Sequence, residues 1–228
     1  MSVADRPWRR EGLVLAVAVG VVGLTFGVLA NAAGLSLPQV VVMSALVFTG
    51  ASQFAAVSVI ASDGSGLAAF GSAMLLAARN ALYGPVVARF LPTNRAARLA
   101  SAHLVIDETT AMASVQSNDD DASDAFFWTG IWLWTLWNVA SVVGALIGSE
   151  IGDPAAWGLD VAFPAGFVAL LAPHVKAAPG WVAAFAGAAT AIATTPILPA
   201  GVPLLLAALA IVPGWLVGRR SVSEAEAS

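Results

Sequence analysis

Charged residues are missing from three long stretches of this 228-residue chain. No Asp, Glu, Lys or Arg occurs between Gly12 and Ser62, between Ala125 and Ser149, or between Ala177 and Gly218. Charged residues make up 11% of the chain and hydrophobic residues 59%, against about 25% and 45–50% in soluble domains. A helix that crosses a bilayer needs about 20 mostly apolar residues, and each stretch is long enough to hold at least one. This composition excludes an ordinary soluble domain.

The chain also lacks cysteine and contains only two histidines. The absence of cysteine excludes disulfide bonds, thiolate metal sites and cysteine nucleophiles. The two histidines are not accompanied by a second cluster of ligands, so we expect no metal site and no cofactor. The net charge of −4 comes without a basic patch, and nothing therefore indicates nucleic-acid binding.

The apolar segments are expected to be helices, because lipid offers no hydrogen-bond partners to exposed backbone groups. We predict an all-α, polytopic helical membrane protein with six to eight transmembrane segments, some of them broken or re-entrant. Residues 1–228 form a single transmembrane domain, with a cytoplasmic N-terminal segment (1–11) and a cytoplasmic tail (219–228). The expected segments are Gly12–Ala33, Leu37–Ala61, Gly66–Phe90, Leu99–Val115, Phe126–Gly148, Gly158–Pro173, Gly180–Leu198 and Gly201–Gly218.

The start of the chain allows two interpretations. Arg6, Arg9 and Arg10 precede an apolar stretch, as they do in a signal peptide. The stretch Gly12–Ala33 has 22 residues, however, and the apolar part of a signal peptide has about 7–15. An uncleaved first span in the plasma membrane, with a cytoplasmic N-terminus, fits better.

The distribution of Lys and Arg predicts the topology, because these residues accumulate in cytoplasmic loops. The basic clusters are Arg6/Arg9/Arg10, Arg89/Arg95/Arg98, Lys176 and Arg219/Arg220. If all eight segments crossed, Arg89–Arg98 would lie outside the cell. If Leu37–Ala61 and Leu99–Val115 instead re-enter the membrane or lie at its surface, every basic cluster is cytoplasmic. We favour this arrangement, with six crossings, over eight.

Three parts of the chain are irregular. Leu99–Val115 is short and polar, Gly158–Pro173 is short and contains a proline, and three prolines lie between Thr195 and Pro203. Interrupted segments of this kind are typical of discontinuous helices in transporters, which bind substrate near the middle of the membrane. A proline kink or a tight hairpin would explain any one of them equally well.

Arg79 lies near the middle of the third segment. A charged side chain at the centre of a membrane helix costs at least about 2.5–3.5 kcal/mol, so Arg79 needs a partner. One interpretation is that its guanidinium binds a substrate carboxylate. Asn80 and Tyr83, which lies four residues on and hence on the same helical face, would then join the site. The alternative is a structural ion pair with Asp107 or Glu108.

Two further groups of polar residues lie in apolar segments. Gln53 follows Ser52 in a charge-free run, where it would line a substrate site at an unwound helix or form an interhelical hydrogen bond of about 0.6–2 kcal/mol. His103 and Asp107 have the i,i+4 spacing of one helical face. Together with Glu108 they suit proton coupling or an ion pair, or else a solvated face at the membrane surface.

Asn138 and Asp160 are secondary candidates, and Asp160 would otherwise cap the short segment that follows it. An intramembrane enzyme is a weaker alternative. Ser52 would be its nucleophile, but the glycine expected two residues later in a Gly-x-Ser-x-Gly motif is absent. A channel or pore is a further alternative to a transporter.

A series of short motifs appears in a fixed order along the chain. They are Pro38, Gly50-Ala51-Ser52-Gln53-Phe54, Arg79 followed by Leu82-Tyr83-Gly84-Pro85, His103-Leu104-Val105-Ile106-Asp107-Glu108-Thr109, and Gly158-Leu159-Asp160 followed by Ala162-Phe163-Pro164. This series resembles the AzlC-type branched-chain amino acid permease family over about residues 10–215. The chain departs from the family at Ala77, where a polar residue is common, and at Asn80, where histidine is common.

The resemblance implies a secondary transporter that exports branched-chain or similar hydrophobic amino acids across the plasma membrane. It also implies a partner, a small hydrophobic AzlD-like membrane subunit, and homo-oligomers are a further possibility. With the resemblance in view, we expect Ser52, Gln53, Arg79, Asn80 and Tyr83 to bind substrate. His103, Asp107 and Glu108 would serve proton coupling or pair with Arg79.

Overall fold

The computed structural model describes residues 6–151, 175–199 and 202–226, with four isolated positions between residues 152 and 174. These described residues contain helices and no strand. The elements are α1 (Pro7–Ala32), α2 (Leu37–Leu46), α3 (Ala51–Ala61), α4 (Gly66–Ala78), η2 (Arg79–Tyr83), α5 (Gly84–Val87), α6 (Arg95–Ala102), α7 (Asp107–Ser114), α8 (Asp119–Ile151), α10 (Ala178–Thr194), α11 (Val202–Ala207), η5 (Ala208–Ala210) and α12 (Ile211–Glu226).

Three stretches of helix are long and apolar enough to cross a membrane on their own. They are Pro7–Ala32, Asp119–Glu150 and Val202–Arg219, and shorter apolar helices accompany them. The third expected segment runs through α4, η2 and α5, and it falls short of such a span because a 3-10 helix interrupts it. The structure confirms the predicted all-α membrane class.

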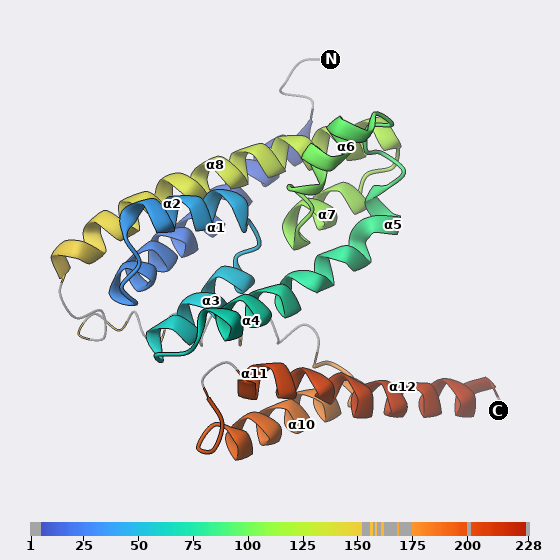
Figure 1. The fold of residues 1–228 in the computed structure, drawn as a ribbon. Coiled ribbons are helices and arrows are strands. Elements are labelled where there is room, and N and C mark those ends of the chain that lie inside the picture. Colours follow the sequence, from blue (N-terminus) through green and yellow to red (C-terminus); the bar gives the residue numbers. More distant parts are fainter. Residues whose placement is uncertain are drawn as a thin grey trace.

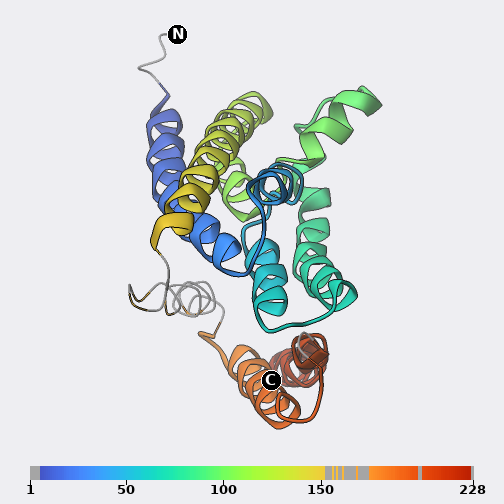
Figure 2. The ribbon, with the colours of Figure 1, turned by 60° about the vertical axis from the view of Figure 1, so that its left-hand side comes forward.

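Helices α1 and α8 pack side by side along most of their lengths (Figures 1 and 2). Glycines bring the two backbones into contact. A side-chain carbon at Gly27 would overlap the carbonyl oxygen of Ser141, and one at Gly144 would overlap that of Leu24. The two helices run in the same direction, because the contacting pairs follow the same order in both: Trp8 with Asp124, Gly12 with Thr129, Gly20 with Leu136, Gly27 with Ser141, and Val28 with Gly148.

Helices α2 and α3 form a helical hairpin, called hairpin A, which turns at residues 47–50. Helix α2 runs back along α8, where Ser44 Oγ donates to Ser141 Oγ (3.2 Å) and Trp134 Nε1 donates to the Ala45 carbonyl (3.3 Å). Gly50 makes the turn at a φ of 58°, a left-handed value that strains residues with a side chain. Helix α3 then returns towards the end where α2 began (Figure 1).

Helices α6 and α7 form a second hairpin, called hairpin B, which turns at residues 103–106. It enters from the opposite end of the bundle, where Arg89 pairs with Asp119 at the start of α8 (3.5 Å). Its turn reaches the level of Gly130, which contacts Leu104. Helix α7 returns to the end where α6 began, since Ala113 belongs to one core cluster with Ala122 of α8.

The turns of the two hairpins meet, and the rings of the buried Phe48 and the exposed His103 lie 5.9 Å apart there. The chain thus repeats one order of elements in opposite directions. First α1 is followed by hairpin A, and then α4–η2–α5, which runs the other way, is followed by hairpin B (Figure 1). The two hairpins are the segments Leu37–Ala61 and Leu99–Val115 for which the positive-inside rule predicts re-entry, and the six-crossing arrangement stays a prediction. Gly158–Pro173, which that arrangement also counts, lies outside the described residues except for three isolated positions.

Helices α10 and α12 form a pair beside the region from α1 to α8 (Figure 2). The pair is antiparallel, because Pro179 at the start of α10 contacts Gly214 and Gly218 in α12. Helix α11, which precedes α12, contacts α4 through Leu205, which lies against Gly71. The expected last span, Gly201–Gly218, is divided among α11, η5 and α12.

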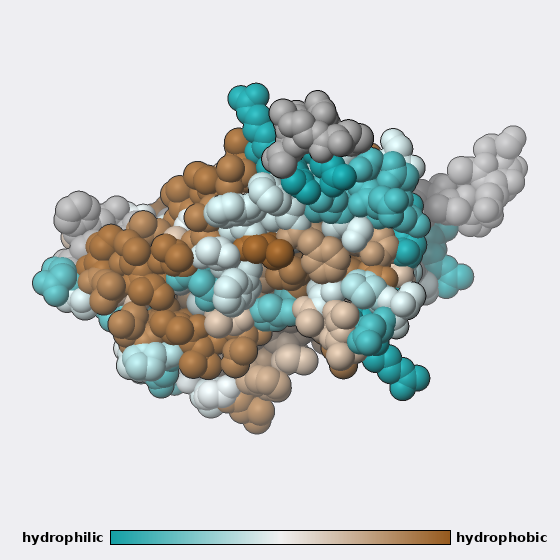
Figure 3. Space-filling model, turned by 90° about the horizontal axis from the view of Figure 1, so that it is seen from above, coloured by the Kyte–Doolittle hydropathy of each residue, from teal (hydrophilic) through white to brown (hydrophobic). Residues whose placement is uncertain are grey.

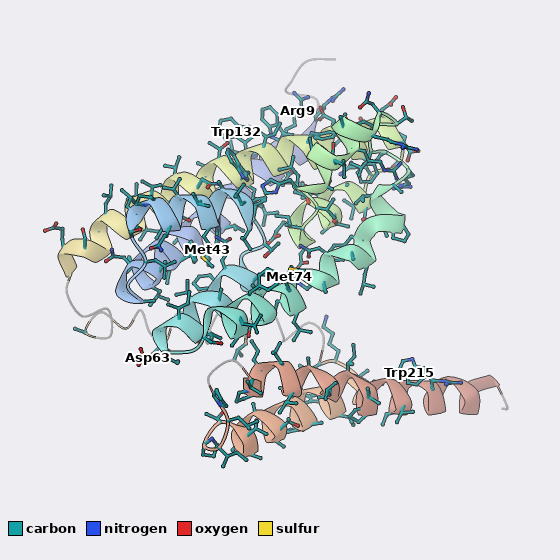
Figure 4. All side chains as sticks on the ribbon, viewed as in Figure 1. Arg9, Met43, Asp63, Met74, Trp132 and Trp215 are labelled. Atoms are coloured by element: carbon teal, nitrogen blue, oxygen red, sulfur yellow. The ribbon has the colours of Figure 1, made fainter. Side chains whose placement is uncertain are left out.

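Charged and apolar side chains are separated along the molecule. Arg9 and Asp63 lie at opposite ends of the α1–α5 region (Figure 4). In Figure 3, apolar side chains cover much of the left side of the face, and hydrophilic ones gather towards the upper right. Many large apolar side chains are exposed, among them Val14, Val21 and Leu67. In a chain of this class, lipid is the solvent that such a surface requires.

Candidate functional site

A cavity of about 410 Å³ lies where the two hairpins meet the interrupted helix, and we call it the tip cavity. Hairpin A, the η2–α5 region and hairpin B each contribute to its wall. Most of the lining is apolar, with a few polar groups, which is the usual character of small-molecule sites. The lining residues are Leu46, Phe48, Thr49, Asn80, Ala81, Gly84, Val87, Leu91, Arg98, Ala102, His103 and Val105.

The 3-10 helix η2 has a local cause in the sequence. Pro85 has no N–H group, so it cannot donate to the carbonyl of Ala81, and its ring crowds that carbonyl. The turn before it tightens into a 3-10 helix from Arg79 to Tyr83. Tighter winding changes which side chains share a face, and Asn80 and Ala81 face the tip cavity.

Arg79, Tyr83 and Asp107 form a network beside the cavity. Arg79 Nη2 lies 2.9 Å from Asp107 Oδ2, and Tyr83 Oη donates to Asp107 Oδ1 at 2.7 Å. The side chains of Arg79 and Asp107 are 38% and 31% exposed. Arg79 therefore forms the ion pair that the sequence offered as the alternative to a carboxylate clamp. Its charge is balanced within the protein.

Asp107 is placed for this role by the start of α7. It is the first residue of the helix, and Glu108 follows it. The N-terminus of a helix carries partial positive charge, which favours carboxylates in the first turn. Ile106 precedes the helix with an extended backbone, and its N–H donates to Thr109 Oγ1 (3.2 Å).

Hairpin A buries several polar groups close to its turn. The amide of Gln53 is fully buried, and its Oε1 accepts from the Gly50 N–H at 3.3 Å. Since that contact fixes the oxygen, the remaining group is the Nε2 donor, which has no partner in the described structure. The Ser52 and Thr49 hydroxyls and Trp137 Nε1 are likewise buried without a partner there. Native proteins leave few such groups, so each needs an explanation.

The structure brings some predicted residues together and separates others. Asn80 and His103 line the tip cavity, and Ser52 and Gln53 lie behind the turn of hairpin A. Asn138 bonds instead to its own helix, where Nδ2 donates to the Trp134 carbonyl at 2.8 Å. Asp160 lies outside the described residues. Among the described residues, no group of three or more His, Asp or Glu side chains is placed to hold a metal ion.

The expected shared face of His103 and Asp107 is wrong. Helix α6 ends at Ala102 and α7 begins at Asp107, so the two residues lie on either side of the turn of hairpin B. The i,i+4 rule applies only within one continuous helix. His103 faces Phe48 and the cavity, whereas Asp107 faces Arg79.

In the sequence, Arg98 counted only as one of the basic residues that indicate topology. The structure places it in the wall of the tip cavity, together with Ala102 four residues later on α6. The i,i+4 spacing of Arg98 and Ala102 could have indicated this, because it places both residues on one face of the helix that ends just before His103. Thr49 also lines the cavity, and the sequence did not single it out because an uncharged hydroxyl is common in apolar segments.

The fold defines an all-α membrane protein with a cavity between two helical hairpins and an interrupted helix. The model of the family described as "AzlC protein" matches residues 14–151, which is more than half of the chain. The chain belongs to the AzlC family. Nothing matches it among the curated proteins or the solved structures that were searched.

Membership of this family gives the chain a membrane transport role for branched-chain amino acids. The family is one of transporters and not of enzymes, and its members in general work with AzlD. The match ends at Ile151, so it covers α1 to α8 and both hairpins.

Proposed function

We propose that this chain exports branched-chain amino acids across the plasma membrane, as the large subunit of a two-component secondary transporter. The substrate occupies the tip cavity. Its side chain contacts the apolar wall formed by residues such as Leu46, Phe48 and Val87. Asn80 and Thr49 lie at the same cavity and supply polar contacts for the amino acid backbone.

The observation that carries this proposal is the meeting of two hairpins from opposite ends of the bundle at one cavity. Secondary transporters are often built from repeats of inverted direction, with discontinuous helices around a site near the middle of the membrane. Here the order of helix and hairpin occurs twice in opposite directions, and the third wall of the cavity is also a broken helix. Movement of one hairpin against the other would open such a site to one side of the membrane and then to the other.

The network at Asp107 supplies a group for coupling transport to a proton. In this conformation Asp107 is held by Arg79 and by Tyr83. Protonation of Asp107 would remove the charge that holds Arg79, and the adjoining turn at His103 would be free to move. Ser52 and Gln53 lie behind the opposite turn, and their unpartnered donors acquire partners when hairpin A moves.

The orientation proposed is a cytoplasmic N-terminus and a cytoplasmic Arg89–Arg98 loop. Lys and Arg accumulate on the cytoplasmic side. Two features support the same side for both clusters: Arg9 binds Asp124 near the start of α8, and Arg89 pairs with Asp119 at that start. The tail after Arg219 belongs on this side as well.

Transport by the purified chain in proteoliposomes tests the function. Vesicles loaded with unlabelled valine should accumulate labelled valine by counterflow when the chain and its AzlD-like subunit are both present, and much less with either alone. Flux that neither saturates nor exchanges would favour a channel, and full activity of the single chain would contradict the two-component proposal. Loss of all activity in Ser52→Ala with a hydrolysed product would favour an enzyme.

A further inference from the structure

The charges around the tip cavity are all of one kind. Arg98 is the permanently charged side chain among its lining residues, His103 is the second basic one, and no Asp or Glu belongs to this lining. The neighbouring acids Asp107 and Glu108 begin α7, outside the lining, and Asp107 is occupied by Arg79. The cavity therefore attracts the negative end of a zwitterion.

Arg98 is free to bind such a group. Among the residues that the structure describes it takes part in no ion pair and no side-chain hydrogen bond, and it is exposed. Arg79 differs, because its guanidinium lies 2.9 Å from a carboxylate. A planar guanidinium binds a carboxylate through two parallel hydrogen bonds, and a free one is available for an incoming ligand.

The rest of the cavity fits a branched side chain. Leu46 from α2, Val87 from α5 and Leu91 after it are apolar, and Arg98 and Ala102 lie on one face of α6. An amino acid with its carboxylate at α6 would direct its side chain towards the walls from α2 and α5. Burying an apolar side chain there contributes affinity, while the arginine fixes orientation.

Taking the proposed transport function as its basis, we propose that Arg98 is the residue that binds the carboxylate of the substrate in the tip cavity. Arg79, by contrast, is a structural partner of Asp107. Arg98 lies in the first turn of α6, next to the end of the bundle that is proposed to be cytoplasmic, so it would meet substrate arriving from the cytoplasm.

The test compares valine with valinamide, in which an uncharged amide replaces the carboxylate. Each is used unlabelled to inhibit counterflow of labelled valine by the complex of the chain with its AzlD-like subunit. The variants are Arg98→Gln, Arg98→Lys and, as a matched control, Arg95→Gln, which removes another exposed arginine of α6 that is not among the cavity's lining residues. The readout is the ratio of the two half-inhibiting concentrations, which does not depend on how much protein folds.

The wild-type complex should prefer valine about tenfold or more, because a hydrogen bond to a charged group contributes about 1.5–3 kcal/mol. Arg98→Gln should bring the ratio close to one, Arg98→Lys should give an intermediate ratio, and Arg95→Gln should leave it unchanged. An unchanged ratio in Arg98→Gln, or an equal loss in Arg95→Gln, would overturn the assignment. Absence of counterflow in the wild-type complex would overturn the transport function itself, and the assignment with it.

Discussion

The ion pair between Arg79 and Asp107 makes a quantitative prediction about the interior of the bundle. Two unit charges 2.9 Å apart attract each other by about 6 kcal/mol at an effective dielectric constant of about 20, and by about 1.4 kcal/mol in water. Both side chains are about one-third exposed, and the cost of desolvating them offsets much of the attraction. We expect a net coupling of about 1–3 kcal/mol.

A double-mutant cycle measures this coupling. Arg79→Ala and Asp107→Ala should each destabilise the protein, and the double variant should lose less than the sum of the two. Asp107 also lies in the first turn of α7, where a carboxylate contributes about 0.3–1 kcal/mol by interacting with the helix dipole. Asp107→Ala removes that contribution both from the wild-type protein and from the Arg79→Ala variant, so it cancels from the coupling energy.

The chain offers a matched control pair. Arg89 and Asp119 lie 3.5 Å apart at the end of the bundle, with side chains 48% and 57% exposed. Exposed pairs of this kind contribute about 0–1 kcal/mol. The same cycle with Arg89→Ala and Asp119→Ala should therefore give a smaller coupling than the inner pair.

Unfolding in mixed detergent micelles, followed by tryptophan fluorescence, gives the four free energies of each cycle. Trp137 is a suitable reporter because it is buried between α1, α3 and α8, with its ring against Phe26 and Phe54. If the coupling of Arg79 with Asp107 were no larger than that of the control pair, the inner pair would contribute no more to stability than an exposed surface pair does. Arg79 would then be a group that faces water and remains available to substrate.

Three further predictions concern the frame of the site. Gly144→Ala should destabilise the protein by about 3 kcal/mol or more, because the added carbon would meet the Leu24 carbonyl. Gly66→Ala is the control in the same unfolding assay, since Gly66 has open space around it and its substitution should not destabilise the protein in this way. Equal effects of the two substitutions would refute the close contact of α1 with α8. Gly50→Ala should cost about 1 kcal/mol or more, because its φ of 58° suits glycine; unchanged stability would show that the turn of hairpin A is not strained. A single cysteine at Ala96 should react with membrane-impermeant reagents only after the cells are opened, and labelling of intact cells would favour eight crossings.

The long spans could be predicted from the sequence because the bilayer acts on composition alone. Hydrocarbon excludes charge, so a run without charged residues such as Gly12–Ser62 marks membrane segments whatever its neighbours are. The basic residues Arg89–Arg98 led to the expectation that the segments of hairpins A and B re-enter the membrane, because the positive-inside rule needs only the positions of Lys and Arg. That topology stays a prediction. Neither inference needs a tertiary contact.

The interior of the site was less predictable because its breaks depend on tertiary contacts. Pro85 permits a 3-10 helix at Arg79, whereas the turn between α6 and α7 places His103 beside Phe48 of the other hairpin, a contact between residues 55 positions apart. Residues 103–106 carry no glycine or proline to announce it. For the same reason Arg98 looked like a loop residue, although it lines the cavity.

The parallel packing of α1 against α8 has a consequence for biosynthesis. The surface of α1 that contains Gly20 and Gly27 has its partner more than 100 residues later in the chain, at residues such as Leu136 and Ser141. We therefore expect α1 to enter the bilayer with its glycine face exposed to lipid until α8 has been inserted. Hairpin A, which rests on α8 through Ser44 and Ser141, can settle only afterwards. We therefore expect the tip cavity, whose wall includes hairpin A, to be completed late, and a chain whose synthesis stops before α8 should lack it.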